Sequence, residues 1–127
     1  MAFMLKIRWD IKNREVANFK SNQEALCKVM LDHPGVICYH VDYPSEVVSE
    51  WVEIYANHDA FRAHLANEKG KSPLSAVIEA SDKITCRCFG DPDAESRKIL
   101  EGFGTTYHNT APNAFALNPR ADKDSRV

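Results

Sequence analysis

The stretch VICYHVDYPSEVVSEWVEIYA, residues 36–56, decides the fold of this chain. Residues 36–43 and 47–56 are rich in β-branched and aromatic side chains, a composition typical of strands. Between them lies YPSE, residues 43–46, in which Pro44 favours a turn. Because two strands joined by so short a connection pair antiparallel, the stretch predicts a β-hairpin.

The segments on either side of the hairpin extend it into a pattern of strand, helix, strand, strand, helix, strand. FMLKIRWDI, residues 3–11, alternates apolar and polar side chains and is expected to form a strand with one apolar face. The other expected elements are a helix over 14–32 that ends at His33-Pro34-Gly35, a helix over 59–68, a short helix capped by Ser72 with Pro73 in its first turn, and a strand over 83–90. This order predicts an α+β fold with a ferredoxin-like antiparallel sheet and helices on one face. The bare second face of such a sheet favours pairing with another copy of the chain.

The residues after position 90 predict an extension of the same domain. In DPDAESRKILEG, residues 91–102, Asp91 is the expected helix cap, Pro92 lies in the first turn and Gly102 ends the helix. FGTTYHN, residues 103–109, is expected to be a fifth strand, one that can reach onto a partner subunit. The predicted organisation is a domain over 1–90, a helix-strand extension of it over 91–110, and a charged, flexible tail over 111–127.

The composition is that of an ordinary globular domain and argues against several classes of partner. Of the 127 residues 44% are hydrophobic and 27% are charged, and 16 Lys and Arg against 18 Asp and Glu give a formal net charge of −2. Both signs are interspersed, so no nucleic-acid partner is expected. No apolar run approaches the roughly 20 residues that cross a bilayer, and the N-terminus lacks a signal-peptide pattern. These features predict a cytoplasmic protein with no membrane partner.

The cysteines and histidines are not spaced as metal ligands. Cys27, Cys38, Cys86 and Cys88 are expected to be free thiols, because disulfides are rare in a reducing compartment. The five histidines are scattered along the chain. No bound metal is therefore predicted.

Two further stretches carry a pattern that points to a family. LDHPGVICYHVDY, residues 31–43, places Pro-Gly before a strand with a central tyrosine. WVEIYANHDAFRAHL, residues 51–65, places Glu and Tyr on a strand before a capped helix that contains Ala-Phe and a histidine. Together they resemble the antibiotic biosynthesis monooxygenase family of dimeric α+β barrels, over roughly residues 3–90. The resemblance implies a homodimer whose sheets face each other to form a barrel, with a small apolar pocket in each subunit.

The resemblance also implies an activity. Characterised members of the family oxidise phenolic, quinol or anthrone-like substrates with molecular oxygen and without metal or flavin, which implies a monooxygenase that needs no cofactor. His64 matches the family's helix histidine, Glu53 and Tyr55 match the preceding strand, and Tyr39 matches the tyrosine after Pro-Gly. The alternative is a non-catalytic homodimer that binds a small ligand, or a stress-response protein with the same barrel. Family members typically end near the fourth strand, whereas this chain continues beyond it. The resemblance therefore does not determine where the mouth of the pocket lies.

His64 and Glu53 are the candidate catalytic residues. His64 shares with Phe61 and Leu65 the helix stripe that is expected to face inward. A histidine needs little tuning to act as a base, because its ordinary pKa is about 6.5. The alternative for His64 is a packed core histidine. The candidate substrate-binding residues are aromatic: Trp9, Tyr39, Trp51, Tyr55 and Phe61.

The faces of the strand over 47–56 are harder to assign. Two sets alternate along it, with Trp51, Glu53 and Tyr55 on one face and Val48, Val52 and Ile54 on the other. The aliphatic set suits packing against helices, and the aromatic and acidic set suits the barrel interior. In the barrel interior, Glu53 fits a dimer interface as well as a substrate site. His40, on the opposite face from Tyr39, is a second candidate, since a one-residue error in strand phase exchanges the two faces.

Overall fold

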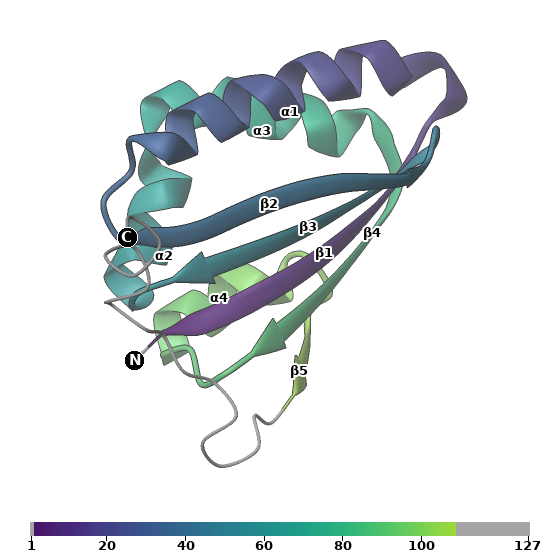
Figure 1. Ribbon diagram of the computed structural model, residues 1–127. Coiled ribbons are helices and arrows are strands. Elements are labelled where there is room, and N and C mark those ends of the chain that lie inside the picture. The colour runs from purple at the N-terminus through teal and green to yellow at the C-terminus, as the bar shows by residue number, and fades with distance from the viewer. Residues whose placement is uncertain (1, 109–127) are drawn as a thin grey trace, which may run out of the picture.

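A computed structural model describes residues 2–108 of the chain (Figure 1). Its elements are β1 (Phe3–Ile11), a 3-10 turn (Asn13–Glu15), α1 (Val16–Leu31), β2 (Val36–Ser45), β3 (Val48–Tyr55), α2 (His58–Ala66), α3 (Glu68–Glu79), β4 (Ser81–Phe89), α4 (Ala94–Glu101) and β5 (Thr106–His108). The predicted tail over 111–127 and the last two residues of the predicted extension, 109 and 110, lie outside the described residues. Within the described range, no helix combines the length and the apolar character needed to span a bilayer.

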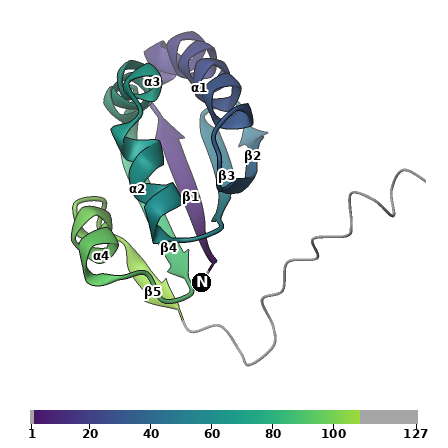
Figure 2. The same ribbon diagram turned by 90° about the vertical axis from the view of Figure 1, so that its left-hand side faces the viewer.

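The strands form one sheet in the order β2-β3-β1-β4-β5. The pairs β2–β3, β3–β1 and β1–β4 are antiparallel, whereas β5 joins β4 in parallel. Figures 1 and 2 show α1, α2 and α3 over one face of this sheet. The predicted α+β, ferredoxin-like fold is therefore confirmed, and the described part of the fifth strand pairs within its own chain.

The start of α3 differs from the prediction. The Asn67 side chain accepts a hydrogen bond from the Lys69 backbone N–H at 3.0 Å, so Asn67 caps the helix five residues before Ser72. Pro73 consequently lies inside the helix instead of in its first turn. The prediction that Ser72 caps the helix is wrong because Asn67, which also ends α2, provides an earlier cap.

The start of α4 is also corrected. The Asp93 side chain accepts a hydrogen bond from the Ser96 backbone N–H at 2.9 Å and is the cap. Asp91, the predicted cap, instead forms an ion pair with Arg97 at 3.1 Å. The predicted end at Gly102 is confirmed, since this residue follows the last helical turn.

The register of β1 and β3 shows which side of the sheet meets the helices. Inner side chains are paired across the two strands: Phe3 with Tyr55, Leu5 with Glu53 and Ile7 with Trp51. The Trp51 ring lies 4.7 Å from that of Trp9 and 6.0 Å from that of Phe19 on α1, between ring centroids. The expectation that the aliphatic set of β3 packs against the helices is wrong. Side chains that are paired in register on neighbouring strands point to the same side of the sheet. The aromatic and acidic set of β3 is paired with the apolar set of β1, so both sets face the helices.

The interior consists of two apolar clusters on the same side of the sheet. One lies under α1 and α3 and includes Trp9, Phe19 and Trp51. The other lies under α2 and α4 and includes Phe61 and Leu100. The two clusters meet near the middle of β1, and the candidate site lies there.

Candidate functional site

A cavity of about 40 Å³ lies between the sheet and the helices, where the two apolar clusters meet. Its wall is mostly apolar and comes from all four long strands and from α2, α3 and the α4 region: Leu5, Ile7, Trp9, Tyr39, Trp51, Glu53, Phe61, His64, Leu65, Leu74, Ile84, Cys86, Leu100 and Phe103. Among the described residues that line this wall, only Glu53 carries a carboxyl group and only His64 carries an imidazole. The two predicted catalytic residues therefore lie in the same cavity.

Glu53 is a buried acid on the inner face of β3. Its exposed fraction is 3%, and it lies between Trp51 and Tyr55 in the alternation of the strand. Burial raises the pKa of Glu53 to about 7, and a hydrogen bond donated by the Tyr55 hydroxyl to Glu53 Oε1 opposes part of that rise. A carboxyl group with this pKa can both accept and release a proton near neutral pH.

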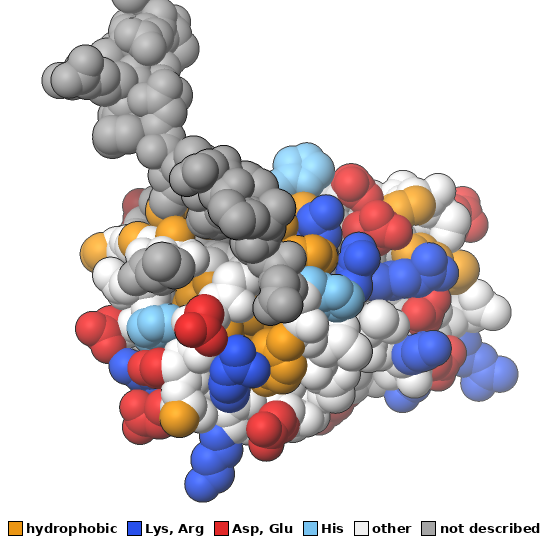
Figure 3. All heavy atoms as spheres, turned by 90° about the horizontal axis from the view of Figure 1, so that it is seen from below, with side chains coloured by type: hydrophobic (Ala, Val, Ile, Leu, Met, Phe, Trp, Pro, Cys, Tyr) orange, Lys and Arg blue, Asp and Glu red, His pale blue; other side chains and the backbone are white. Residues whose placement is uncertain are grey.

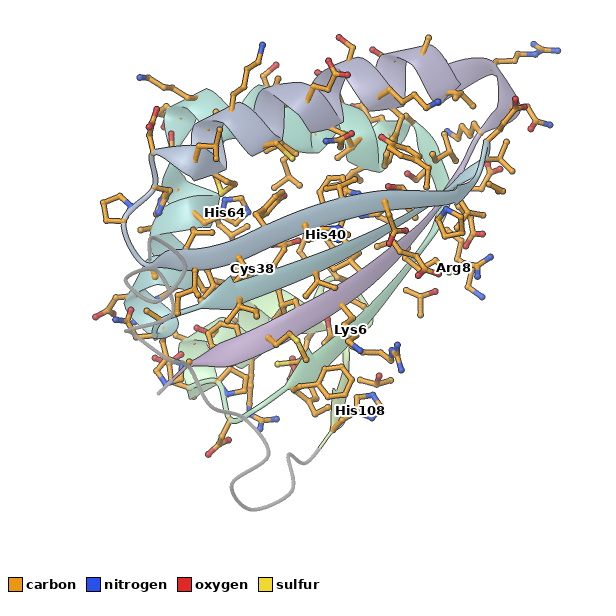
Figure 4. The ribbon with its side chains drawn as sticks, in the orientation of Figure 1. Lys6, Arg8, Cys38, His40, His64 and His108 are labelled. Atoms are coloured by element: carbon orange, nitrogen blue, oxygen red, sulfur yellow. The ribbon has the colours of Figure 1, made fainter. Side chains whose placement is uncertain are left out.

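His64 reaches the cavity from α2. The helix is capped by Asn57, whose side chain accepts a hydrogen bond from the Ala60 backbone N–H at 2.9 Å. The inward stripe of α2 then carries Phe61 and His64, and Figure 4 shows His64 between the helices and the sheet. Its Nε2 lies 4.0 Å from Glu53 Oε1.

The two candidate catalytic residues have opposite pKa shifts. Burial lowers the pKa of His64 to about 4, and the nearby His33, whose ring centroid is 6.3 Å away, lowers it further. Between about pH 4 and about pH 7, His64 and Glu53 are both uncharged, and their contact joins neutral groups. Glu53, and not the histidine, is therefore the group whose pKa lies near neutrality.

Three buried polar atoms have no hydrogen-bond partner among the described residues. They are the Tyr39 hydroxyl oxygen, His64 Nδ1 and Trp9 Nε1, and all three residues line the cavity. Buried polar groups in proteins are nearly always partnered. Burial, together with the negative charge available to Glu53, raises the pKa of Tyr39 well above its usual range, so its hydroxyl keeps its proton. These atoms are free to bind water or a ligand in the cavity.

The predicted aromatic residues are gathered around this site. Trp9, Tyr39, Trp51 and Phe61 line the cavity, and Tyr55 lies behind Glu53 as its hydrogen-bond donor. His64 is 6.0 Å from Tyr39 and 5.8 Å from Tyr55 between ring centroids. His40, the second histidine candidate, is exposed on the opposite side of the sheet and takes no part in the cavity.

Sequence reasoning missed the contribution of the extension. Leu100, at the end of α4, and Phe103, just after it, both line the cavity. The apolar spacing of Ile99, Leu100 and Phe103 in KILEGF is the signal that could have indicated an inward-facing stripe. The extension therefore contributes to the wall of the candidate site.

Polar contacts hold α4 against α2. The Arg62 guanidinium of α2 lies 2.6 Å from Asp93 and 3.5 Å from Glu95, and it also contacts Asp59 at 2.7 Å. This guanidinium holds the pKa of the Asp93 carboxyl well below its usual range. The His58 ring accepts a hydrogen bond from the Asp93 backbone N–H at 3.2 Å. Asp93 thus caps α4 and ties its first turn to α2.

The structure contains no preformed metal site in the part of the chain that it describes. Among residues 2–108, no three His, Cys, Asp or Glu side chains come together closely enough to hold an ion. The four cysteines are free thiols, as predicted.

No known family profile matches the sequence. No curated protein matches it either. Solved structures, in contrast, share its fold. MupZ from Pseudomonas fluorescens is 13% identical and superimposes with a TM-score of 0.72 over 94% of this chain and 97% of that one. SnoaB from Streptomyces nogalater, described as a cofactor-independent oxygenase, is 17% identical, with a TM-score of 0.60 over 73% of this chain and 95% of that one.

A third similar structure carries the name of the family that the two sequence stretches resemble. It is a protein from Nitrosomonas europaea described as a candidate antibiotic biosynthesis monooxygenase, 12% identical, with a TM-score of 0.64 over 70% of this chain and 97% of that one. The predicted resemblance is thus confirmed at the level of the fold. The match to MupZ covers a larger share of this chain than either of the other two matches.

Proposed function

We propose that this protein is a cofactor-independent monooxygenase that oxidises a small phenol, quinol or anthrone-like aromatic compound with molecular oxygen. The observation that carries the proposal is Glu53, a buried carboxyl group with a pKa of about 7 in the wall of an otherwise apolar cavity. The shared fold with SnoaB, described as a cofactor-independent oxygenase, supports the same reaction class.

The chemistry requires a base and a dry pocket. The Glu53 carboxylate takes the phenolic proton of the substrate, and the resulting electron-rich anion reacts with oxygen. One oxygen atom replaces two hydrogens on the substrate carbon and the other leaves with those hydrogens as water, so the substrate itself supplies all four electrons that reduce the oxygen molecule. The unpartnered Tyr39 hydroxyl and Trp9 N–H are donors that can hold a substrate oxygen as it becomes negative. The neutral His64 fills the wall beside the base.

Substrate entry requires the cavity to expand. Its volume of about 40 Å³ is well below the roughly 150 Å³ of an engineered cavity that binds benzene. Leu65, Leu74 and Phe103 line the cavity and remain partly exposed, so we expect these side chains to move when an aromatic ring enters. The mouth then lies beside the extension.

Oxygen consumption tests the proposal directly. With a panel of phenols, hydroquinones and anthrones, wild type is expected to consume oxygen at a rate that rises with pH through about 7, because only the carboxylate form of Glu53 accepts a proton. Glu53→Gln should reduce that rate about 100-fold or more. Glu46→Gln, the same change at an exposed position in the β2–β3 turn, should leave it unaltered. Absence of uptake with every compound in the panel would contradict the proposal.

A second candidate function is binding of a small ligand without turnover. The buried Tyr39 hydroxyl and His64 Nδ1, which have no hydrogen-bond partner among the described residues, favour it, because they can bind a small polar ligand without any proton transfer to Glu53. A compound that shifts the melting temperature of wild type, yet causes no oxygen uptake, would identify this case. A role in a stress response would then rest on the identity of that ligand.

We further propose that the protein works as a homodimer in the cytoplasm. The support for the dimer is the outer face of the sheet, the side turned away from the helices, which carries the partly buried apolar side chains Met4, Val52, Ile54 and Phe89. The four free thiols fit a reducing compartment. Light scattering at micromolar concentration tests the dimer, and a monomer there would contradict it.

A further inference from the structure

The Glu53 carboxyl group is almost completely shielded from solvent. Its side chain is buried, and the cavity that it lines is bordered mostly by apolar side chains. A proton must nevertheless pass between this group and bulk water whenever Glu53 changes between its acid and its carboxylate form. Apolar side chains cannot carry a proton, so the route has to consist of polar groups that connect Glu53 with the surface.

Most polar groups around Glu53 hold their own protons at neutral pH. Burial raises the pKa of Tyr55, which donates a hydrogen bond to Glu53, well above its usual range, and it does the same for Tyr39. Burial also raises the pKa of the Cys86 thiol to about 11, and it raises that of the Cys27 thiol. Phenols and thiols that stay protonated are poor proton acceptors, so these four groups do not explain how Glu53 reaches solvent.

His64 has the two ring nitrogens that a proton relay needs. Its Nε2 lies 4.0 Å from Glu53 Oε1, and its Nδ1 has no hydrogen-bond partner among the described residues. A neutral imidazole has one N–H donor and one acceptor nitrogen. When Glu53 gives its proton to Nε2, the ring can release the proton on Nδ1, so a proton passes through without a lasting imidazolium ion. This suits a ring whose pKa is lowered by burial to about 4.

His33 lies beside His64, in the loop between α1 and β2. The two rings are almost perpendicular, at 88°, and their centroids are 6.3 Å apart. His33 is partly exposed, so it meets solvent where His64 does not. Its Nδ1 lies 3.0 Å from the carbonyl oxygen of Pro34, which can only accept a hydrogen bond. Nδ1 of the neutral ring therefore carries the hydrogen, and Nε2 is left as the nitrogen that takes up a proton.

We propose that His64 and His33 form a relay that carries the proton of Glu53 to solvent at the α1–β2 loop. In the outward direction, the Glu53 carboxyl group protonates His64 Nε2 and His64 Nδ1 releases its proton. His33 Nε2 takes that proton up, directly or through one bridging water, and then gives it to bulk water. The resulting His64 tautomer carries its hydrogen on Nε2 and faces a carboxylate, and the inward direction reverses every step.

The rate at which Glu53 exchanges its proton tests the relay without any assay of activity. At the midpoint of the titration, the ¹³C signal of the labelled carboxyl carbon reports this rate. Fast exchange gives one averaged signal, and slow exchange gives separate signals for the acid and the carboxylate. His33→Phe keeps a ring beside His64 but removes both nitrogens, so it should slow the exchange about 100-fold. Imidazole added to the solution should restore part of the lost rate in this variant and leave wild type unchanged.

Control variants distinguish the relay from other routes. His40→Phe makes the same substitution on the outer face of the sheet, the side shown in Figure 3, and should leave the exchange rate unchanged. Cys27→Ala removes another partly exposed polar group near Glu53 and should also leave it unchanged. His64→Gln should slow the exchange, and adding His33→Phe should slow it no further, because the two histidines act in series. Circular dichroism checks folding, and His33→Gln provides a second side chain that cannot be protonated.

The possible outcomes separate this inference from the proposed function. A wild-type exchange rate in His33→Phe, or slower exchange in Cys27→Ala, would overturn the relay. A shifted midpoint with an unchanged rate would show that His33 affects the site only through its charge, and it would overturn the relay as well. The relay concerns the ionisation of Glu53, whatever reaction the cavity supports. Slow exchange in His33→Phe, in a protein that oxidises no compound of the panel, would therefore uphold the relay and contradict the oxygenase.

Discussion

The two faces of the sheet carry different kinds of polar group. On the inner face Glu53 and His64 are almost fully buried, so burial itself shifts their pKa values in opposite directions. On the outer face Lys6 and Glu50 lie in an open hollow. One strand, β3, thus carries a buried acid with a raised pKa on one side and a solvent-exposed acid on the other.

The largest expected difference between the faces is in stability. Trp51→Ala removes an inner side chain that is 1% exposed and contacts Trp9 and Phe19, so it should lower the free energy of unfolding by about 3–5 kcal/mol. Thr85→Ala, at an exposed position on the outer face of β4, should change it by less than about 0.5 kcal/mol. Urea denaturation at one fixed protein concentration measures the free energy of unfolding of both variants. Equal losses in the two would contradict the expected difference between the inner and outer faces.

Glu53 should make the protein less stable at alkaline pH. Its folded pKa of about 7 is above its ordinary value of 4.5, so the folded state holds a proton that the unfolded state has lost. The resulting stabilisation is present at low pH and is lost as the pH rises through about 7, with a total of about 3 kcal/mol. Glu53→Gln should abolish this loss, and Glu46→Gln should not. Denaturation curves at pH 5 and pH 8.5 give the change in the free energy of unfolding between these pH values. The same change in both variants as in wild type would refute the raised pKa of Glu53.

His64 should act in the opposite direction. Its folded pKa of about 4 is below its ordinary value of 6.5, so stability present above pH 6.5 is lost as the pH falls toward 4. Between pH 4.5 and 6.5 the contributions of His64 and Glu53 oppose each other, which predicts that wild-type stability changes little in this range. In His64→Gln the free energy of unfolding should fall as the pH rises, because only the contribution of Glu53 remains. In Glu53→Gln it should rise with pH, because only the contribution of His64 remains. Identical slopes in the two variants would contradict the assignment.

The smallest expected effect concerns access to the cavity. Phe103→Ala removes a partly exposed ring from the wall, which should cost about 1–2 kcal/mol of stability and enlarge the space for a ligand. Phenol should then raise the melting temperature of the variant more than that of wild type. Tyr107→Ala, a nearby partly exposed aromatic that does not line the cavity, is the matched control. Equal shifts in both would show that ligands do not enter beside Phe103.

Much of the fold was predictable because its signals are local. The alternation of residues 3–11 and the composition of the hairpin over 36–56 report the strands directly. The two helix starts were misplaced because Asn67 and Asp93 compete with nearby residues that are equally good caps by type. Which candidate becomes the cap depends on how the helix meets its neighbours.

The candidate site was less predictable because it depends on register and burial. His64 was found from its helix stripe, but the inward position of Glu53 follows from its pairing with Leu5, a contact between distant strands. Glu53 has a higher pKa than His64 because both side chains are buried, and only the assembled core creates that burial. Phe103 reaches the cavity because Arg62 ties α4 to α2, and no short motif indicates that contact.

Glu53 is a buried acid whose pKa lies near neutrality, and titration of its carboxyl group tests this directly. Its carboxyl carbon can be followed by ¹³C NMR from pH 4 to pH 9 in protein labelled at glutamate, with Glu53→Gln used to assign the signal. We expect a midpoint near pH 7 that moves when a hydroquinone analogue is added. A midpoint near 4.5, unaffected by the analogue, would show that Glu53 is an ordinary carboxylate and would contradict its role as the base.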